Sequence, residues 1–196
     1  TFGRGGELMK PWNLLLPVGI SFYTFQSISY LIDVYRREIK AETSFANFGA
    51  YLTMFPQLIA GPIVKYREIK EEMLKRRASF AQFDEGLRIF TIGLGMKVLL
   101  ANRIGSLWSD IQAVGFESIS TPVAWMGIFA YSFQLYFDFY GYSMMAIGLG
   151  RIMGFTIPQN FDHPYEALSM TEFWRRWHMT LGSWFREYVY IPLGGN

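Results

Sequence analysis

Four long apolar runs dominate this sequence, and each is interrupted by residues that a uniform membrane helix would not carry. The runs cover 12–31, 45–64, 86–104 and 122–150. An α-helix needs about 20 residues to cross the hydrocarbon core of a bilayer, and each run approaches or exceeds that length. Prolines and glycines break the first two runs, while polar or charged residues enter the others. We therefore predict an all-α, polytopic membrane helical bundle with broken or re-entrant helices.

Composition supports a membrane protein and excludes several classes of site. Charged residues make up 17% of the chain and hydrophobic residues 51%, whereas a typical soluble domain has about 25% charged residues. A net charge of +2 gives no reason to expect nucleic acid as a partner. The chain has no cysteine, which excludes disulfides, zinc–thiolate sites and cysteine nucleophiles. Its two histidines lie in different elements, so no metal site is predicted.

The basic residues predict which segments face the cytoplasm. Segment 65–77 carries six lysines or arginines, segment 33–42 carries three, and linker 105–121 carries none. Basic loops stay on the cytoplasmic side, so run 45–64 should enter and leave on that side as a re-entrant segment. The prolines and glycine of 55–63 suit that shape, and Gln57 would then line a cavity. We also expect a helix break near residues 139–142 and a loop over 151–170.

The segment from Thr171 to Ile191 carries the densest chemical signal. On a single amphipathic C-terminal helix, its aromatic residues share one face and His178 lies at the edge of that face. Gly182 and Ser183 would leave space for a substrate beside the imidazole. A desolvated histidine suits the role of a general base. The alternative is an interfacial helix whose aromatic residues anchor it at the headgroups and whose histidine is incidental.

Polar residues inside the longest run are the next candidates. A carboxylate at membrane depth is expensive, so Asp138 is either a functional group or a structural hydrogen-bond partner of another helix. Gln134 lies one helical turn before it. Lys97 is expected to extend its amine to an interface rather than take part in catalysis. His163 is expected to belong to a turn stabilised by Asp162.

Four segments together resemble the membrane-bound O-acyltransferases, and most closely their bacterial alginate O-acetylation branch. They are residues 16–26, 55–63, 136–143 and 173–188, the last containing Trp-Arg-Arg-Trp-His. The resemblance runs from about residue 12 to 196 and implies many membrane helices around a central funnel. It matches His178 to a family histidine. Beside His178, we expect the residues of a substrate channel to be Asp138, Gln134, Gln57, Trp177 and Arg175. A second family histidine would lie beyond residue 196, and His163 does not match it.

The resemblance also implies the reaction and the location. We expect an O-acyltransferase that moves an acyl group, in the first place acetyl, towards hydroxyls of an exported cell-envelope polysaccharide. The donor would be acetyl-coenzyme A or a carrier-protein thioester, with no permanently bound cofactor. The expected partners are the lipid bilayer, the polysaccharide or a periplasmic acyltransferase, and an acyl carrier protein. The location would be the bacterial inner membrane, crossed several times.

Three alternatives remain open from the sequence alone. They are D-alanyl or other acyl transfer to an envelope polymer, a membrane transporter or flippase, and a structural membrane scaffold. The chain begins at Thr1 rather than at methionine. We therefore expect residues 1–196 to form a single membrane domain that is the central fragment of a longer acyltransferase, inactive alone.

Overall fold

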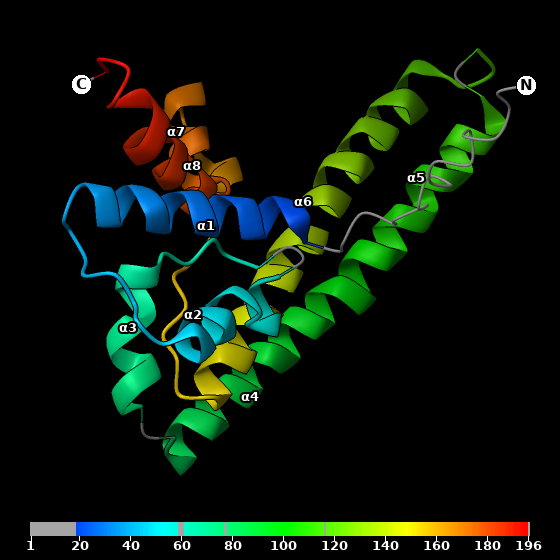
Figure 1. The fold of residues 1–196 in the computed structure, drawn as a ribbon. Helices are drawn as coiled ribbons and strands as arrows, with labels where there is room; N and C mark the ends of the chain where they lie inside the picture. The colour runs from blue at the N-terminus through cyan, green and yellow to red at the C-terminus, as the bar shows by residue number, and fades with distance from the viewer. Residues whose placement is uncertain (1–18, 59–60, 77, 116, 196) are drawn as a thin grey trace, which may run out of the picture.

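The computed structural model describes residues 19–58, 61–76, 78–115 and 117–195. These residues form helices and connecting segments with no strand, which confirms the predicted all-α class (Figure 1). The start of the first apolar run, up to residue 18, lies outside the described residues, as do residues 59–60 of the second run.

The described residues form eight α-helices and four short helical segments. The α-helices are α1 (Ile20–Tyr35), α2 (Phe45–Leu52), α3 (Tyr66–Lys75), α4 (Phe80–Gly95), α5 (Asn102–Val114), α6 (Thr121–Ile152), α7 (Met170–Arg176) and α8 (Met179–Phe185). The short segments are the 3₁₀ turns η1 (Phe55–Gln57) and η3 (Pro164–Glu166) and the π-helical turns η2 (Met96–Ala101) and η4 (Arg186–Tyr190).

Helices α4 and α5, joined by η2, form one long rod, and α6 packs antiparallel along it (Figure 1). The expected linker over 105–121 is therefore wrong for most of its length, because α5 continues to Val114. The expected break near residues 139–142 is also wrong, because α6 is continuous over 32 residues. Gly141 serves close helix packing instead: a Cβ there would meet the carbonyl oxygen of Gly93 at 2.7 Å.

Helix α1 lies between two apolar cores. On one side, Tyr30 packs with side chains of α2, α3 and the segment after α6, among them Tyr51, Tyr66 and Phe155. On the other side, Phe25 contacts Trp184 of α8, with ring centroids 4.7 Å apart. Helices α7 and α8 consequently lie across α1 from α2 and α3 (Figure 1).

The second apolar run breaks where its prolines predicted. Helix α2 ends at Leu52, η1 spans only three residues, and residues 61–65 are not helical. The charged segment that follows is helical, as predicted, but α3 is not exposed all round, because Tyr66 and Ile69 are buried. The predicted loop after α6 is also confirmed, with only the short η3 inside it.

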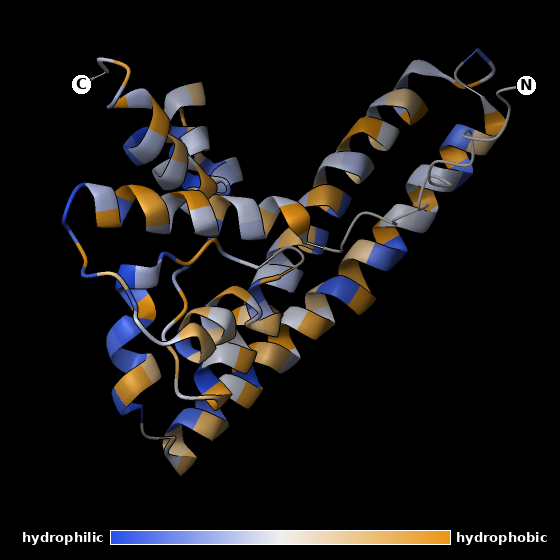
Figure 2. Ribbon diagram, in the orientation of Figure 1, coloured by the Kyte–Doolittle hydropathy of each residue, from blue (hydrophilic) through white to orange (hydrophobic). Residues whose placement is uncertain are grey.

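Large apolar side chains cover much of the outer surface of the rod and of α6, among them Leu99 and Phe129, which are 67% and 57% exposed. Figure 2 shows hydrophobic residues distributed along both long elements. Within the described part of the chain, however, no helix combines the length and the apolar character that crossing a bilayer requires.

Candidate functional site

The predicted helix over 171–191 is broken at Trp177 and His178, so the expected helical face is wrong. Trp177 has an extended backbone, and His178 has a left-handed one, with φ of 45°. The segment after α6 replaces the missing helical hydrogen bonds. The Asp162 N–H donates to the Arg176 carbonyl at 3.0 Å, and the Met179 N–H donates to the Asn160 carbonyl at 2.9 Å.

The side chain of Asn160, a fully buried residue, joins His178 to α8 and α6. Its Oδ1 atom lies 3.0 Å from Nδ1 of His178. The same oxygen accepts hydrogen bonds from the hydroxyl and the backbone N–H of Thr180, at 2.9 and 3.3 Å. Its Nδ2 atom donates to the Ser143 hydroxyl of α6 at 3.2 Å. One amide therefore holds four groups, which belong to His178, Thr180 and Ser143.

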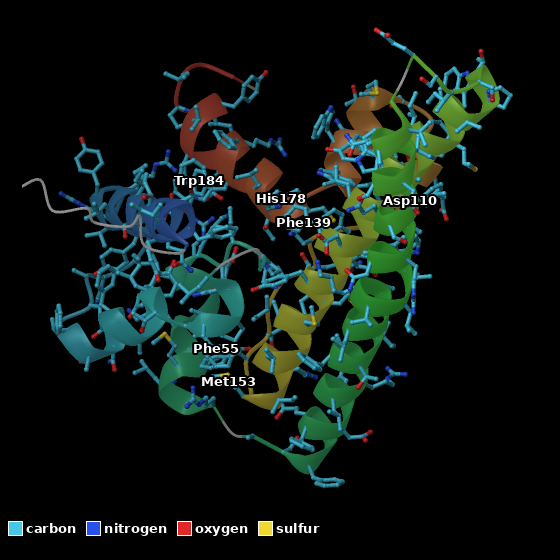
Figure 3. The ribbon with its side chains drawn as sticks, turned by 90° about the vertical axis from the view of Figure 1, so that its right-hand side faces the viewer. Phe55, Asp110, Phe139, Met153, His178 and Trp184 are labelled. Atoms are coloured by element: carbon cyan, nitrogen blue, oxygen red, sulfur yellow. The ribbon has the colours of Figure 1, made fainter. Side chains whose placement is uncertain are left out.

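The imidazole of His178 is electrically neutral at ordinary pH. Its ring meets Phe139 of α6 edge-on, with centroids 4.8 Å apart (Figure 3). Burial lowers the pKa of His178 from 6.5 to about 4, because a desolvated imidazolium is disfavoured. A neutral imidazole keeps a free lone pair on one nitrogen, which is the state that a general base requires.

Trp177 belongs to an aromatic cluster that we define as Tyr136, Phe161, Tyr165, Phe173 and Trp177. Trp177 stacks on Phe173 at 5.6 Å and meets Phe161 edge-on at 5.0 Å. The Tyr165 hydroxyl donates to the Ser132 carbonyl of α6 at 2.8 Å. The cluster ties α7 to α6 directly beside His178.

Arg175 lies on an open pocket of about 580 Å³ between α7 and the α8–η4 segment. Its lining consists of Thr171, Trp174, Arg175, Met179, Gly182, Ser183, Arg186 and Tyr190. A smaller pocket, of about 200 Å³, shares Met179 and Ser183 with it. Gly182 and Ser183 thus border open space as expected, but the imidazole of His178 is not part of either lining.

The other predicted channel residues lie in separate surroundings. Asp138 forms an ion pair with Lys97 of η2, and both side chains are partly exposed. The extension of Lys97 to an interface stays a prediction. Gln134 lies against Gly105 of α5. Gln57 is fully buried and donates to the Tyr51 carbonyl at 2.9 Å. None of these contacts involves α7 or α8. His163 contacts Asp162 at 3.1 Å in a turn, as predicted.

An ionic network around Glu187, which the sequence analysis missed, joins η4 to α3 and α1. The Lys65 amine lies 2.5 Å from one oxygen of Glu187, and the Arg67 guanidinium pairs with the other. Burial alone would raise the pKa of Glu187, but the hydrogen bonds from Lys65 and Arg67 outweigh burial and lower it. Buried Asp33 accepts a hydrogen bond from the Tyr188 hydroxyl at 2.8 Å.

Three carboxylates of this network, from Asp33, Glu38 and Glu187, lie close enough together to ligate a metal ion. Arg67 already contacts all three. Its guanidinium neutralises the carboxylates that a cation would need, so the network fits an ionic clamp better than a metal centre. In the sequence, the feature that could have indicated this network is Asp33, an acidic residue just after the first apolar run.

Asn160 and Thr180 were also missed. Asn160 lies in a proline-bounded segment where asparagine is common in turns, and Thr180 lies inside an expected helix. Their importance depends on a contact across 20 residues of sequence. No periodicity in the sequence reports such a contact.

Comparison with known proteins agrees with the family resemblance of the motifs. Residues 36–196 match the sequence model of the membrane-bound O-acyltransferase family. The chain is 47% identical over 191 residues to a probable alginate O-acetylase of Pseudomonas aeruginosa, covering 96% of this chain and 36% of the relative.

Two further relatives act, by their names, on other envelope polymers. A peptidoglycan O-acetyltransferase of Helicobacter pylori is 40% identical, over 94% of this chain and 40% of the relative. A teichoic acid D-alanyltransferase of Streptococcus thermophilus is 31% identical, over 92% of this chain and 45% of the relative. The chain thus spans less than half the length of each of these three relatives, and it belongs to the membrane-bound O-acyltransferase family.

Proposed function

We propose that this chain carries part of the active site of an O-acyltransferase that moves an acetyl group towards hydroxyls of an exported envelope polysaccharide. The observation that carries the proposal is His178, a neutral and partly buried imidazole held at a break between two helices. The names of the relatives support the reaction class. Acetyl is favoured over D-alanyl because the relatives named for O-acetylation are 40–47% identical, against 30–31% for the D-alanyl ones.

In the proposed step, the acceptor is a hydroxyl and the donor is a thioester. The hydroxyl oxygen attacks the carbonyl carbon as its proton passes to the free ring nitrogen of His178. The new C–O bond forms, the C–S bond breaks, and the leaving thiolate takes the proton back from the imidazolium. Histidine is thereby restored, and an ester and a free thiol are the products. A positioned base of this kind contributes roughly 10²–10⁴ to the rate.

Trp177 and Arg175 are proposed to line the path of a substrate next to His178. Arg175 is exposed on the larger pocket, and Trp177 belongs to the aromatic cluster and directly precedes His178 in the chain. Gln57 and Gln134 are proposed as polar channel residues, since the Oε1 atom of each is buried without a hydrogen-bond partner among the described residues. Asp138, which forms an ion pair with Lys97, is proposed as the fifth channel residue.

We also propose that the complete protein is a polytopic bundle in the bacterial inner membrane. The exposed apolar side chains of α4, η2, α5 and α6 suit contact with lipid or with further helices. The run 45–64, with α2 and the break after it, fits a re-entrant segment next to the basic segment 65–77. An acyl carrier protein on the cytoplasmic side and a periplasmic acyltransferase are the proposed partners.

The test is to change His178 to Ala, and separately to Gln, in the complete protein and to measure ester-bound acetate on the exported polymer. His163→Ala is the matched control, because His163 is exposed in the structure and contacts Asp162. We expect acetate to fall about 100-fold or more for both His178 variants, at normal membrane abundance, and to stay unchanged for the control. Normal acetylation without His178 would refute its role and favour a structural place for α7 and α8.

A further inference from the structure

We propose that Asn160 is a positioning residue that fixes the proton of His178 on Nδ1 and so presents Nε2 as the base. This inference rests on the proposed function and concerns a residue outside the sequence-predicted site. Its evidence is the set of hydrogen bonds around one buried amide, together with the surroundings of the imidazole.

The first step is the orientation of the amide, which its neighbours determine. The Thr180 backbone N–H can only donate, and it points at Oδ1 of Asn160 at 3.3 Å. The Thr180 hydroxyl accepts the Ile63 N–H at 3.0 Å, so its own hydrogen is available for the same Oδ1, 2.9 Å away. On the other side of the amide, Nδ2 donates to Ser143. A flipped amide would place Nδ2 against the Thr180 N–H, donor against donor.

The second step is the tautomer of the imidazole. Because Oδ1 of Asn160 is an acceptor, Nδ1 of His178 must carry a hydrogen to make its 3.0 Å contact. A neutral imidazole has one N–H only, so Nε2 keeps its lone pair. The Met179 N–H also donates to the Asn160 carbonyl, so the backbone and the side chain of Asn160 hold the same turn.

Among the described residues, the groups that face His178 carry no charge. The imidazole of His178 contacts the ring of Phe139 from α6 and the amide of Asn160 from the segment after α6. Thr180, two residues further along the chain, binds the same amide oxygen. Across the described residues no ion pair includes His178, and burial is the cause of its lowered pKa. A charge introduced at position 160 should therefore act on the imidazole without competition from a neighbouring charge.

The experiment compares Asn160→Leu and Asn160→Asp in membranes that contain the complete protein. Initial rates of labelled acetyl transfer to polymer are measured against pH, with acetyl-coenzyme A and an acetyl-loaded carrier protein each offered as donor. Asn102→Leu is the matched control, because Asn102 is exposed at the start of α5. Abundance in the membrane is measured for every variant.

Leucine removes the acceptor, so kcat should fall about 100-fold, within the usual range for a general base, with little change in KM. Aspartate keeps an acceptor oxygen at the same place and adds a negative charge. It should restore much of the rate and move the acid limb of kcat/KM upward by at least about one pH unit. The control should match the unmodified protein.

Two outcomes would overturn the inference. One is a normal kcat in Asn160→Leu, and the other is an Asn160→Asp variant whose rate changes while its acid limb does not. The aspartate result decides the question if the leucine variant fails to reach the membrane. A failure here leaves the proposed function standing as long as His178→Ala abolishes transfer, whereas full transfer by His178→Ala would refute both.

Discussion

Gly93 and Gly141 face each other where α4 packs along α6, and neither position has room for a side chain. A Cβ on Gly93 would meet the Gly141 carbonyl oxygen at 2.6 Å, and a Cβ on Gly141 would meet that of Gly93 at 2.7 Å. Seven residues away on each helix, Gly86 and Gly148 repeat the arrangement at 2.6 Å. The two backbones therefore touch at two points, which fixes the register of the helix pair.

This contact predicts opposite effects for two neighbouring glycines. Gly93→Ala should destabilise the protein by roughly 1–3 kcal/mol, because the helices must move apart. Gly95→Ala should be neutral or stabilising by up to about 1 kcal/mol, since a Cβ there meets nothing within 4 Å and alanine favours helix. Thermal unfolding of the purified protein measures both. Equal effects of the two substitutions would show that the close approach does not limit packing.

The acid limb of the reaction should lie unusually low. In the proposed step the neutral imidazole of His178 accepts the proton, and burial lowers its pKa from 6.5 to about 4. As pH falls, kcat/KM of the acyl transfer should stay constant through pH 6. It should decline only near pH 4, where the imidazole of His178 gains a proton and can no longer accept one from the hydroxyl. The measurement is kcat/KM against pH over the range in which the protein stays folded. An acid limb between pH 6 and 7 would contradict a desolvated histidine as the base.

Substitution of Lys97 and Asp138, singly and together, can distinguish a structural role of Asp138 from a role in the channel. A structural pair predicts that Lys97→Met and Asp138→Leu each lower stability, while the double variant recovers part of the loss. Contacting residues usually show a coupling of roughly 0.5–3 kcal/mol in such a cycle. Polymer acetate is measured in the same variants. Recovery of stability without recovery of acetate would assign Asp138 to the channel.

The network around Glu187 should stabilise the contact of η4 with α3. Glu187→Gln removes the charge that balances buried Lys65, and hydrogen bonds to charged groups contribute roughly 1.5–3 kcal/mol. Because folding lowers the pKa of Glu187 below its usual 4.5, this stabilisation should be complete above pH 4.5 and decrease as pH falls below it. Unfolding free energies of Glu187→Gln and of the exposed control Glu117→Gln, compared across pH, test this.

The sequence predicted what depends on local patterns. The all-α class, the break after α2 and the loop before α7 follow from apolar runs and from prolines such as Pro56 and Pro158. The sequence does not determine the role of Gly141, because a glycine inside an aromatic run can either break a helix or allow a close approach of two helices. The position of Gly93 opposite Gly141 shows that Gly141 serves the close approach of α4 and α6.

The site depends on contacts that are distant in the sequence. Nothing between Arg176 and Met179 is a helix breaker by type, yet the helix ends there because Asn160 and Asp162 supply other partners for its backbone. Similarly, Lys97 and Asp138 are 41 residues apart. The motif identifies His178 as a candidate, but it does not predict the left-handed backbone of His178 or its contacts with Asn160 and Phe139.

The break at His178 has a mechanical consequence. Helix α7 is fastened to α6 by the aromatic cluster, whereas α8 is fastened to α1 by Trp184, whose indole donates to the Phe25 carbonyl at 3.0 Å. His178 lies in the chain between these two helices, which are attached to different parts of the structure. A displacement of α1 relative to α6 would therefore pull on the backbone at His178, between the two attachments.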